Sequence, residues 1–289
     1  MSIDPNSLGA VSGPKLVTWA DRDTLLYALG VGAGPDELSL VTENSHGVAQ
    51  QVLPTFAVIV AAPFAVLPKL GKPSYGKMLH GAQEIRIARP LQPAGSLRVT
   101  AEISDLQDKG EGGNAIVVLV GKGTDPDTGE LVAESRTTLV FRGHGGFGGQ
   151  PGRSTPRVQL PETPPDLQIV DDTDERLPLI YRLSGDRNPL HSDPWFARTK
   201  AGFPNPIMHG LCTYGIVGRG LVRAVCDGDA QRLLALAARF SAPVFPGERL
   251  TTSVWLREGG EVFFRTEAEV VGSGERRTVL DGGRAEVGP

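Results

Sequence analysis

The sequence has little cysteine and lacks a long uninterrupted apolar run. Only two of its 289 residues are cysteine, too few for a disulfide framework and typical of a reducing compartment. The longest apolar stretch, at 56–67, contains Pro63 and is too short to cross a bilayer. The first residues lack the basic and apolar regions of a signal peptide. We therefore expect a cytoplasmic protein with no membrane span.

A strong excess of charge of one sign is also absent. The 29 basic and 33 acidic residues give a net charge of −4, and no run of Lys and Arg occurs. This balance argues against a nucleic-acid partner. The glycines of 30–34 follow a helix candidate and not a strand, so they do not predict a dinucleotide loop. We expect no cofactor.

Glycine and proline are abundant instead, with 37 and 23 residues. They interrupt many short apolar runs, which favours strands and turns over long helices. The densest break begins at Gly143 and continues as a proline-rich stretch to Pro165. It predicts an extended linker at 143–165, between an N-terminal half at 1–142 and a C-terminal half at 166–289.

The two halves resemble each other. Tyr27 and Tyr181 follow acidic segments in equivalent helix candidates, 154 positions apart. Residues 85–93 and 238–246 share an Arg and a Pro-x-x-Pro pattern at a shift of 153 positions. A nearly constant shift across about 60 residues predicts a duplicated unit of about 130–150 residues.

Each half is expected to form a short helix followed by an antiparallel sheet, which is an α+β unit. The helix candidates are 25–29 and 177–183, with acidic residues or Pro178 at their starts. Glycine-rich turns at 111–113 and 258–260 suit hairpins. The strand candidates are 97–106, 115–120 and 131–141 in the first half, and 250–256, 262–271 and 278–287 in the second.

The most informative stretch runs from Tyr181 to His191. Asp186, Asn188 and His191 lie just past a helix candidate, on a turn stiffened by Pro189. A carboxylate, a carboxamide and an imidazole can together hold and activate one water. The alternative is an Asx turn beside a surface histidine. The aligned first-half positions are Gly32, Gly34 and Glu37. Because the turn forms without these three groups there, the comparison favours a chemical role for them.

This stretch resembles the MaoC-like (R)-specific 2-enoyl-CoA hydratase, or hydratase 2, family. The family pattern Tyr-x-Leu-Ser-Gly-Asp-x-Asn-Pro-Leu-His-x5-Ala is filled from Tyr181 to Ala197. The resemblance implies a double hot dog, which is two tandem units that each wrap an antiparallel sheet around a helix. It also implies a catalytically blank first half that accommodates bulky acyl chains. Further counterparts are 79–81, 108–110, 145–149, 201–215 and 238–247.

The implied reaction is the reversible hydration of a trans-2-enoyl-CoA to a (3R)-3-hydroxyacyl-CoA by syn addition of water. Such hydration needs a base, a proton for C2, and stabilisation of charge on the thioester oxygen. Asp186 and His191 would activate the water, and Asn188 would orient the water or the substrate. The resemblance assigns the thioester oxygen to the Gly210 backbone N–H, at an expected helix start.

The resemblance also implies an acyl-CoA binding surface. Its members are His80, Gly81, Lys109, Phe240 and the motif loop with Arg187, Pro189 and Leu190. Lys109 would pair with a CoA phosphate as a point charge, although an ordinary hairpin lysine is the alternative. His209 is expected to hydrogen-bond a loop. His191, Asp193 and His209 lack a recognised metal-ligand spacing, so no metal site is predicted.

Two other functions remain open. One is a dehydratase of (3R)-hydroxyacyl groups on an acyl carrier protein, in fatty-acid or polyketide-type synthesis. The other is a non-catalytic acyl-binding protein on the same fold, against which the intact Asp186, Asn188 and His191 argue. The family further implies a homodimer.

Overall fold

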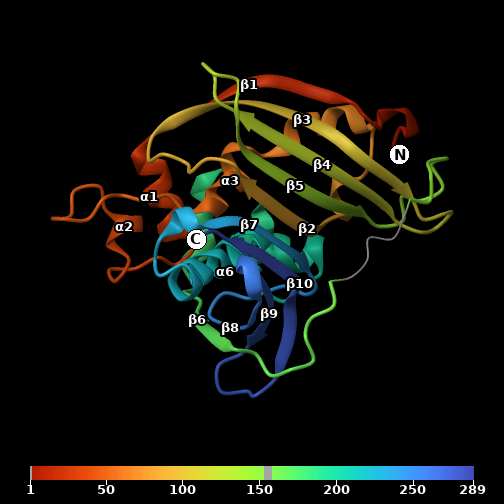
Figure 1. Cartoon of the computed structure of the whole chain (residues 1–289). Helices are drawn as coiled ribbons and strands as arrows, with labels where there is room; N and C mark the ends of the chain where they lie inside the picture. Colours follow the sequence, from red (N-terminus) through yellow and green to blue (C-terminus); the bar gives the residue numbers. More distant parts are fainter. Residues whose placement is uncertain (1, 153–157) are drawn as a thin grey trace.

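The computed structural model describes residues 2–152 and 158–289, and its ten named strands form one continuous antiparallel sheet (Figure 1). The strand order is β1-β3-β4-β5-β2-β7-β10-β9-β8-β6. The first-half strands are β1 (Val11–Trp19), β2 (Met78–Ile87), β3 (Gly95–Asp108), β4 (Ala115–Thr124) and β5 (Leu131–Phe141). The second-half strands are β6 (Leu167–Asp172), β7 (Leu233–Phe240), β8 (Arg249–Leu256), β9 (Glu261–Glu269) and β10 (Arg276–Val287).

The strand order confirms the duplicated unit. Read outward from the centre, each half places its second strand first, then its fifth, fourth, third and first. The halves join where β2 pairs with β7, with Ile85 opposite Leu236. The aligned Tyr27 and Tyr181 meet across the same junction, with ring centroids 5.9 Å apart. One hydrophobic cluster contains buried residues of both halves, so the units share a core.

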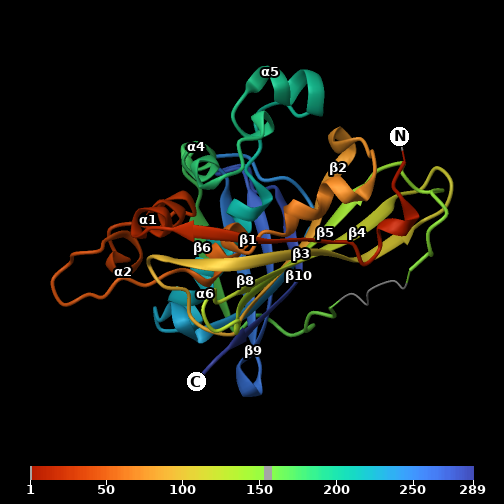
Figure 2. The ribbon, with the colours of Figure 1, turned by 90° about the horizontal axis from the view of Figure 1, so that it is seen from above.

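The helices occupy equivalent places in the two halves but differ in length. The helices are α1 (Asp21–Gly30), α2 (Leu38–Val41), α3 (Ala57–Val60), α4 (Leu177–Tyr181), α5 (Pro194–Phe196) and α6 (Gly210–Val225). Short 3-10 turns extend several of them, and a π-helical turn, Ala197–Ala201, follows α5. In Figure 2 the segment that carries α5 stands away from the sheet.

Helix α6 is the buried helix of the second half, since residues 212–222 are all buried. Two glycines allow this depth. A Cβ at Gly215 would lie 2.5 Å from Val31 Cγ1, and one at Gly218 would lie 2.5 Å from Thr55 Cγ2. The segment 154 positions earlier is broken into α3 and 3-10 turns around Pro63, because proline interrupts a helix. The first half therefore has no helix of comparable length there among its described residues.

The six expected strands all form, with ends shifted by a few residues. The expectation that each half begins with its helix is wrong, because the edge strands β1 and β6 come first. The sequence also failed to predict the central strands β2 and β7. Segment β7 reads Leu-Leu-Ala-Leu-Ala-Ala, which favours a helix by propensity. Pairing with β2 and β10 on its two sides outweighs that preference.

The chain between β5 and β6 contains no named helix or strand in its described part. The extended linker expected at 143–165 stays a prediction, and its residues 153–157 lie outside the described residues. Asp108 fastens the start of this segment, because its carboxylate accepts hydrogen bonds from the backbone N–H groups of Gly146, Gly148 and Gly149. Within the described residues, no helix is long and apolar enough to cross a membrane.

Candidate active site

The loop after α4 is shaped by its own polar side chains. Asp186 Oδ1 accepts from the Asn188 N–H at 3.0 Å, and Asn188 Oδ1 accepts from the Leu190 N–H at 3.1 Å. Asn188 thereby caps the 3-10 turn Pro189–His191. The Asx turn of the alternative interpretation is thus confirmed, but its surface histidine is wrong, because His191 is buried. The second carboxylate oxygen of Asp186 and the Asn188 amide group remain as polar groups on an exposed loop.

His191 points back toward the segment that precedes α6. Its Nδ1 lies 2.8 Å from the Ile207 carbonyl oxygen. A carbonyl can only accept, so Nδ1 carries the proton and Nε2 of the neutral ring has a free lone pair. Burial is the largest cause that lowers the pKa of His191 below its usual 6.5. The side chain is therefore a neutral base at physiological pH.

His209 lies directly against this base. The two imidazole rings stack with centroids 3.8 Å apart and an interplanar angle of 29°. His209 Nε2 lies 3.1 Å from the Asp186 backbone carbonyl and must donate to it. The expectation that His209 hydrogen-bonds a loop is therefore confirmed. Burial is the largest cause that lowers its pKa to about 4, so this ring is also neutral near pH 7.

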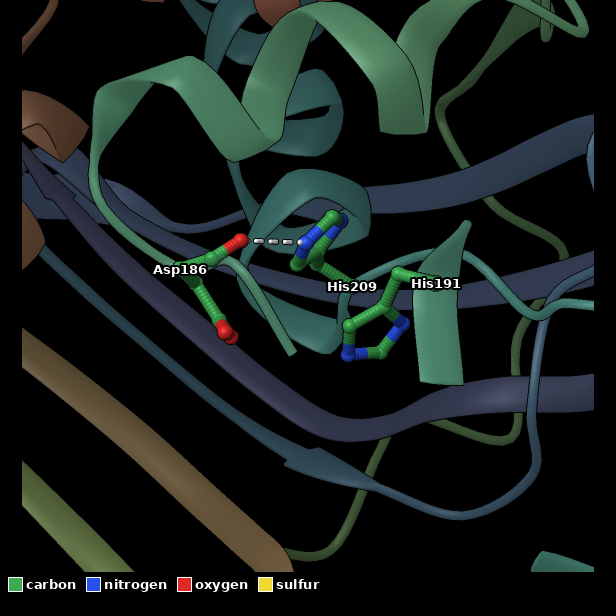
Figure 3. A group of neighbouring side chains, drawn as sticks. All are labelled: Asp186, His191 and His209. Atoms are coloured by element: carbon green, nitrogen blue, oxygen red, sulfur yellow. Dashed lines mark hydrogen bonds between the residues drawn. The ribbon is translucent and has the colours of Figure 1, made fainter. Parts of the chain in front are cut away.

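Asp186 and His191 are close enough to share one water. A carboxylate oxygen of Asp186 and a ring nitrogen of His191 lie within 4.8 Å of each other. Figure 3 shows one nitrogen of His191 turned toward the Asp186 carboxylate. Hydrogen bonds of about 2.8 Å from one water can span that gap. The arrangement provides two acceptors for a water whose proton is to be removed.

The same cluster has some features of a divalent-metal site. Asp186, His191 and His209 offer ligand atoms within 4.8 Å of one another. However, Nε2 of His209 donates to a carbonyl, and its Nδ1 is buried away from the surface. Tetrahedral zinc needs lone pairs that converge at about 2.0–2.2 Å. The free lone pairs here are those of the Asp186 carboxylate, His191 Nε2 and the buried His209 Nδ1, whereas Asp193 caps α5 by accepting from the Trp195 N–H. The expected absence of a metal therefore stays a prediction.

The start of α6 forms a second side of the site. Gly210 is the first residue of α6, and the first N–H groups of a helix have no partner within it. A Cβ at Gly210 would lie 3.1 Å from the Phe240 ring. Phe240 in turn meets His80 edge to face, with centroids 4.8 Å apart. The structure thus brings β2, β7 and α6 together beside the motif loop.

A chain of buried polar groups holds His80. Gln83, 2% exposed, donates through its amide nitrogen to the Glu84 carbonyl and to Ser135 Oγ. Its amide oxygen therefore accepts, both from Thr137 Oγ1 at 2.8 Å and from His80 Nε2 at 3.2 Å. Burial lowers the pKa of His80 to about 4. His80 is consequently a neutral side chain whose Nε2–H already donates to Gln83.

Other predicted site residues lie at the margins or act through the backbone. Gly81 sits at a register shift between β2 and β5, where a Cβ would lie 3.0 Å from Val140 Cγ2, so it helps to aim His80. Lys109 lies in the hairpin between β3 and β4, and its Nζ donates to the Pro151 carbonyl at 2.8 Å. No contact found among the described residues joins Lys109 to the cluster. Within the motif loop, Arg187 and Pro189 are exposed and Leu190 is half-buried.

The sequence pattern alone did not identify the contacts of His209 or the Gln83 network. One sequence signal that His209 lies near the site was its position immediately before Gly210, which the family resemblance places in the site. For Gln83 no such signal existed, because its partners Ser135 and Thr137 are more than 50 positions away.

Comparison with known proteins gives two family matches that together cover most of the chain. Residues 18–143 match the MFE-2 hydratase 2 N-terminal domain, and residues 157–277 match the MaoC like domain. A 3-hydroxyacyl-thioester dehydratase of Mycobacterium tuberculosis is 56% identical over 99% of both chains. An enoyl-CoA hydratase of the same organism is 42% identical over 86% of this chain and 87% of that protein.

Solved structures agree. A MaoC-like dehydratase from Phytophthora capsici superposes with a TM-score of 0.83 at 31% identity, over 98% of this chain and 96% of that one. A Mycobacterium tuberculosis protein described as a double hotdog fold superposes with a TM-score of 0.62 at 17% identity, over 97% and 96% of the two chains. The fold expected from the sequence is thereby confirmed.

Proposed function

The chain belongs to the MaoC-like hydratase 2 family, and on that premise we propose that Asp186 and His191 catalyse its reaction. The protein is a hydro-lyase that interconverts 2-enoyl and 3-hydroxyacyl thioesters, as the names of its relatives indicate. The observation that carries the assignment of residues is the Asp186–His191 pair within 4.8 Å, with its neutral histidine.

Water addition follows from this geometry. His191 Nε2 removes a proton from the water held by Asp186, and the water oxygen bonds to C3. The C2–C3 π electrons move toward the thioester oxygen, giving enolate character. The protonated His191 then returns that proton to C2 as the carbonyl re-forms, either directly or after passing it to the Asp186 carboxylate, so atoms and charge balance. Because both groups would act from one face of the substrate, we propose that the addition is syn, and the family resemblance implies the 3R alcohol.

The start of α6 would stabilise the developing negative charge. The Gly210 N–H points out of the helix end, where the positive end of the helix dipole also favours an anion. Asn188 has its oxygen engaged in the turn. Its amide group would therefore act as a donor, toward the water or the thioester. Phe240 and His80 form the wall beside this position.

The acyl carrier is proposed to be CoA, which is part of the substrate and not a separate cofactor. Exposed Arg187 and Lys109 would meet its phosphates. One relative is named only for a thioester, so an acyl carrier protein is the second candidate. We further propose a homodimer in the cytoplasm. Against a non-catalytic acyl-binding protein stands the complete Asp186 and His191 pair.

A hydration assay tests this function. With crotonyl-CoA and a longer 2-enoyl-CoA, we expect loss of the enoyl thioester absorbance. A stereospecific dehydrogenase should then oxidise the product as the 3R isomer. The same acyl groups on an acyl carrier protein form the comparison, and a higher kcat/KM there would transfer the assignment to that carrier. A 3S product, or no turnover on either carrier, would overturn the proposal.

The pH profile should report the buried base. Because burial lowers the pKa of His191 below 6.5, the neutral form persists on acidification through that value. We expect kcat/KM to stay level from pH 8 to 6.5 and to fall tenfold per pH unit only below the lowered pKa. An acid limb centred above 6.5 would contradict the role of His191.

A further inference from the structure

The residue before Gly210 is placed unusually for the start of a helix. His209 is the N-cap residue of α6, yet its side chain makes no capping hydrogen bond. Side chains at this position commonly satisfy the free N–H groups of the first turn. The His209 imidazole instead lies inside the protein, 1% exposed, and reaches a loop 23 positions earlier in the chain.

That ring contacts both members of the proposed catalytic pair. Its Nε2–H donates to the backbone carbonyl of Asp186, and its face stacks on His191 at 3.8 Å (Figure 3). On the same ring, Tyr181 lies with its centroid 5.0 Å away. The rotational freedom of His209 is therefore small. A shift of the ring would move the Asp186 backbone and the plane of His191 together.

We propose that His209 is the positioning residue of the active site, setting the separation of the Asp186 carboxylate and His191 Nε2. The inference rests on the proposed function, because it assumes that this pair handles the water. It adds a role for a side chain that touches neither water nor substrate. A misplacement of about 1 Å in a reacting constellation can lower the rate about 100-fold.

Two properties distinguish this role from ordinary packing. Among the described residues, Nδ1 of His209 is buried without a hydrogen-bond partner. A buried polar atom of this kind lowers the stability of the fold, so an apolar side chain would fill the space more favourably if packing were the only role. The titratable groups that act on the ring are the neutral His191, Asp186 and Arg182. Burial, reinforced by His191, holds its pKa down at about 4. The ring thus stays neutral when His191 takes up the proton of water.

Three variants test the proposal. His209→Leu removes the donor and the aromatic face, whereas His209→Gln keeps a donor near the position of Nε2. Met208→Leu is the matched control, since Met208 is also buried and directly precedes His209. We expect kcat of His209→Leu to fall about 100-fold, with KM within about threefold of the wild type. The melting temperature should be unchanged, and His209→Gln should regain about tenfold in kcat.

Two results would overturn the inference. One is wild-type kcat in His209→Leu. The other is an equal loss of kcat in His209→Leu and His209→Gln together with a lower melting temperature, which would indicate a packing role. An active Asp186→Asn variant would instead remove the proposed function itself. Failure of the His209 inference and failure of the proposed function can therefore be distinguished with the same set of variants.

Discussion

Asp186→Asn is expected to lower kcat about 1,000-fold while KM changes little. The substitution keeps the size of the side chain, and Oδ1 can still accept from the Asn188 N–H. It removes the negative charge that is proposed to hold the water beside His191, and loss of an acid–base group typically costs 100- to 10,000-fold. His191→Gln should show a loss of similar size. Steady-state kinetics on an enoyl-CoA, together with a melting curve for each variant, measure both effects.

Asp193→Asn provides the matched control. Asp193 lies on the same loop and accepts from the Trp195 N–H at 2.8 Å, an interaction that asparagine also makes at an N-cap. We expect its kcat to remain within about twofold of the wild type. Full activity of Asp186→Asn, or equal losses in the two Asp→Asn variants, would remove Asp186 from the mechanism.

Arg219→Met is expected to reduce the free energy of unfolding by about 3–5 kcal/mol, because it removes the arginine partner of Glu37 and leaves the buried Asp171 with only the partly exposed Arg223. The Arg219 side chain, 7% exposed, binds Glu37 of the first half and Asp171 of β6. Its two N–H···O distances are 2.5 and 2.6 Å. The network therefore connects the two halves through α6. Urea unfolding followed by far-ultraviolet circular dichroism measures the change.

The neighbouring Arg223 provides a control that distinguishes the effect of a buried ion pair from that of an exposed one. It reaches the same Asp171 oxygen at 3.3 Å, but its side chain is 44% exposed. Exposed pairs contribute about 1 kcal/mol or less, so Arg223→Met should cost no more than that. Similar losses for the two arginine variants would show that the buried network contributes little beyond surface charge.

The same ion network involves the first-half residues that align with the catalytic motif. Glu37 occupies the position that aligns with His191, and it pairs with Arg219. Gly32 aligns with Asp186, and a Cβ there would lie 3.6 Å from the Arg219 guanidinium. Two of the three first-half positions that align with the motif are therefore next to a buried ion network. In this half the same turn has a structural use.

The amino-acid sequence by itself determined the family, the duplication and the position of the proposed active-site loop. These rest on local features: the run from Tyr181 to His191, the Gly-rich hairpin turns, and a shift of about 154 positions between the halves. Hairpin turns and Asx turns are set by residues a few positions apart. Their chemistry is therefore visible in a short window of sequence.

Only the tertiary structure decided which distant groups surround the loop. Strand β7 formed against its helical propensity, because β2 and β10 pair with it on both sides. His80 is held by Gln83, and Gln83 in turn by Ser135 and Thr137 of another strand. His209 reaches Asp186 and His191 because it directly precedes the buried helix α6. The sequence carries the side chains, but their distances depend on pairings between segments far apart in the chain, which local patterns do not encode.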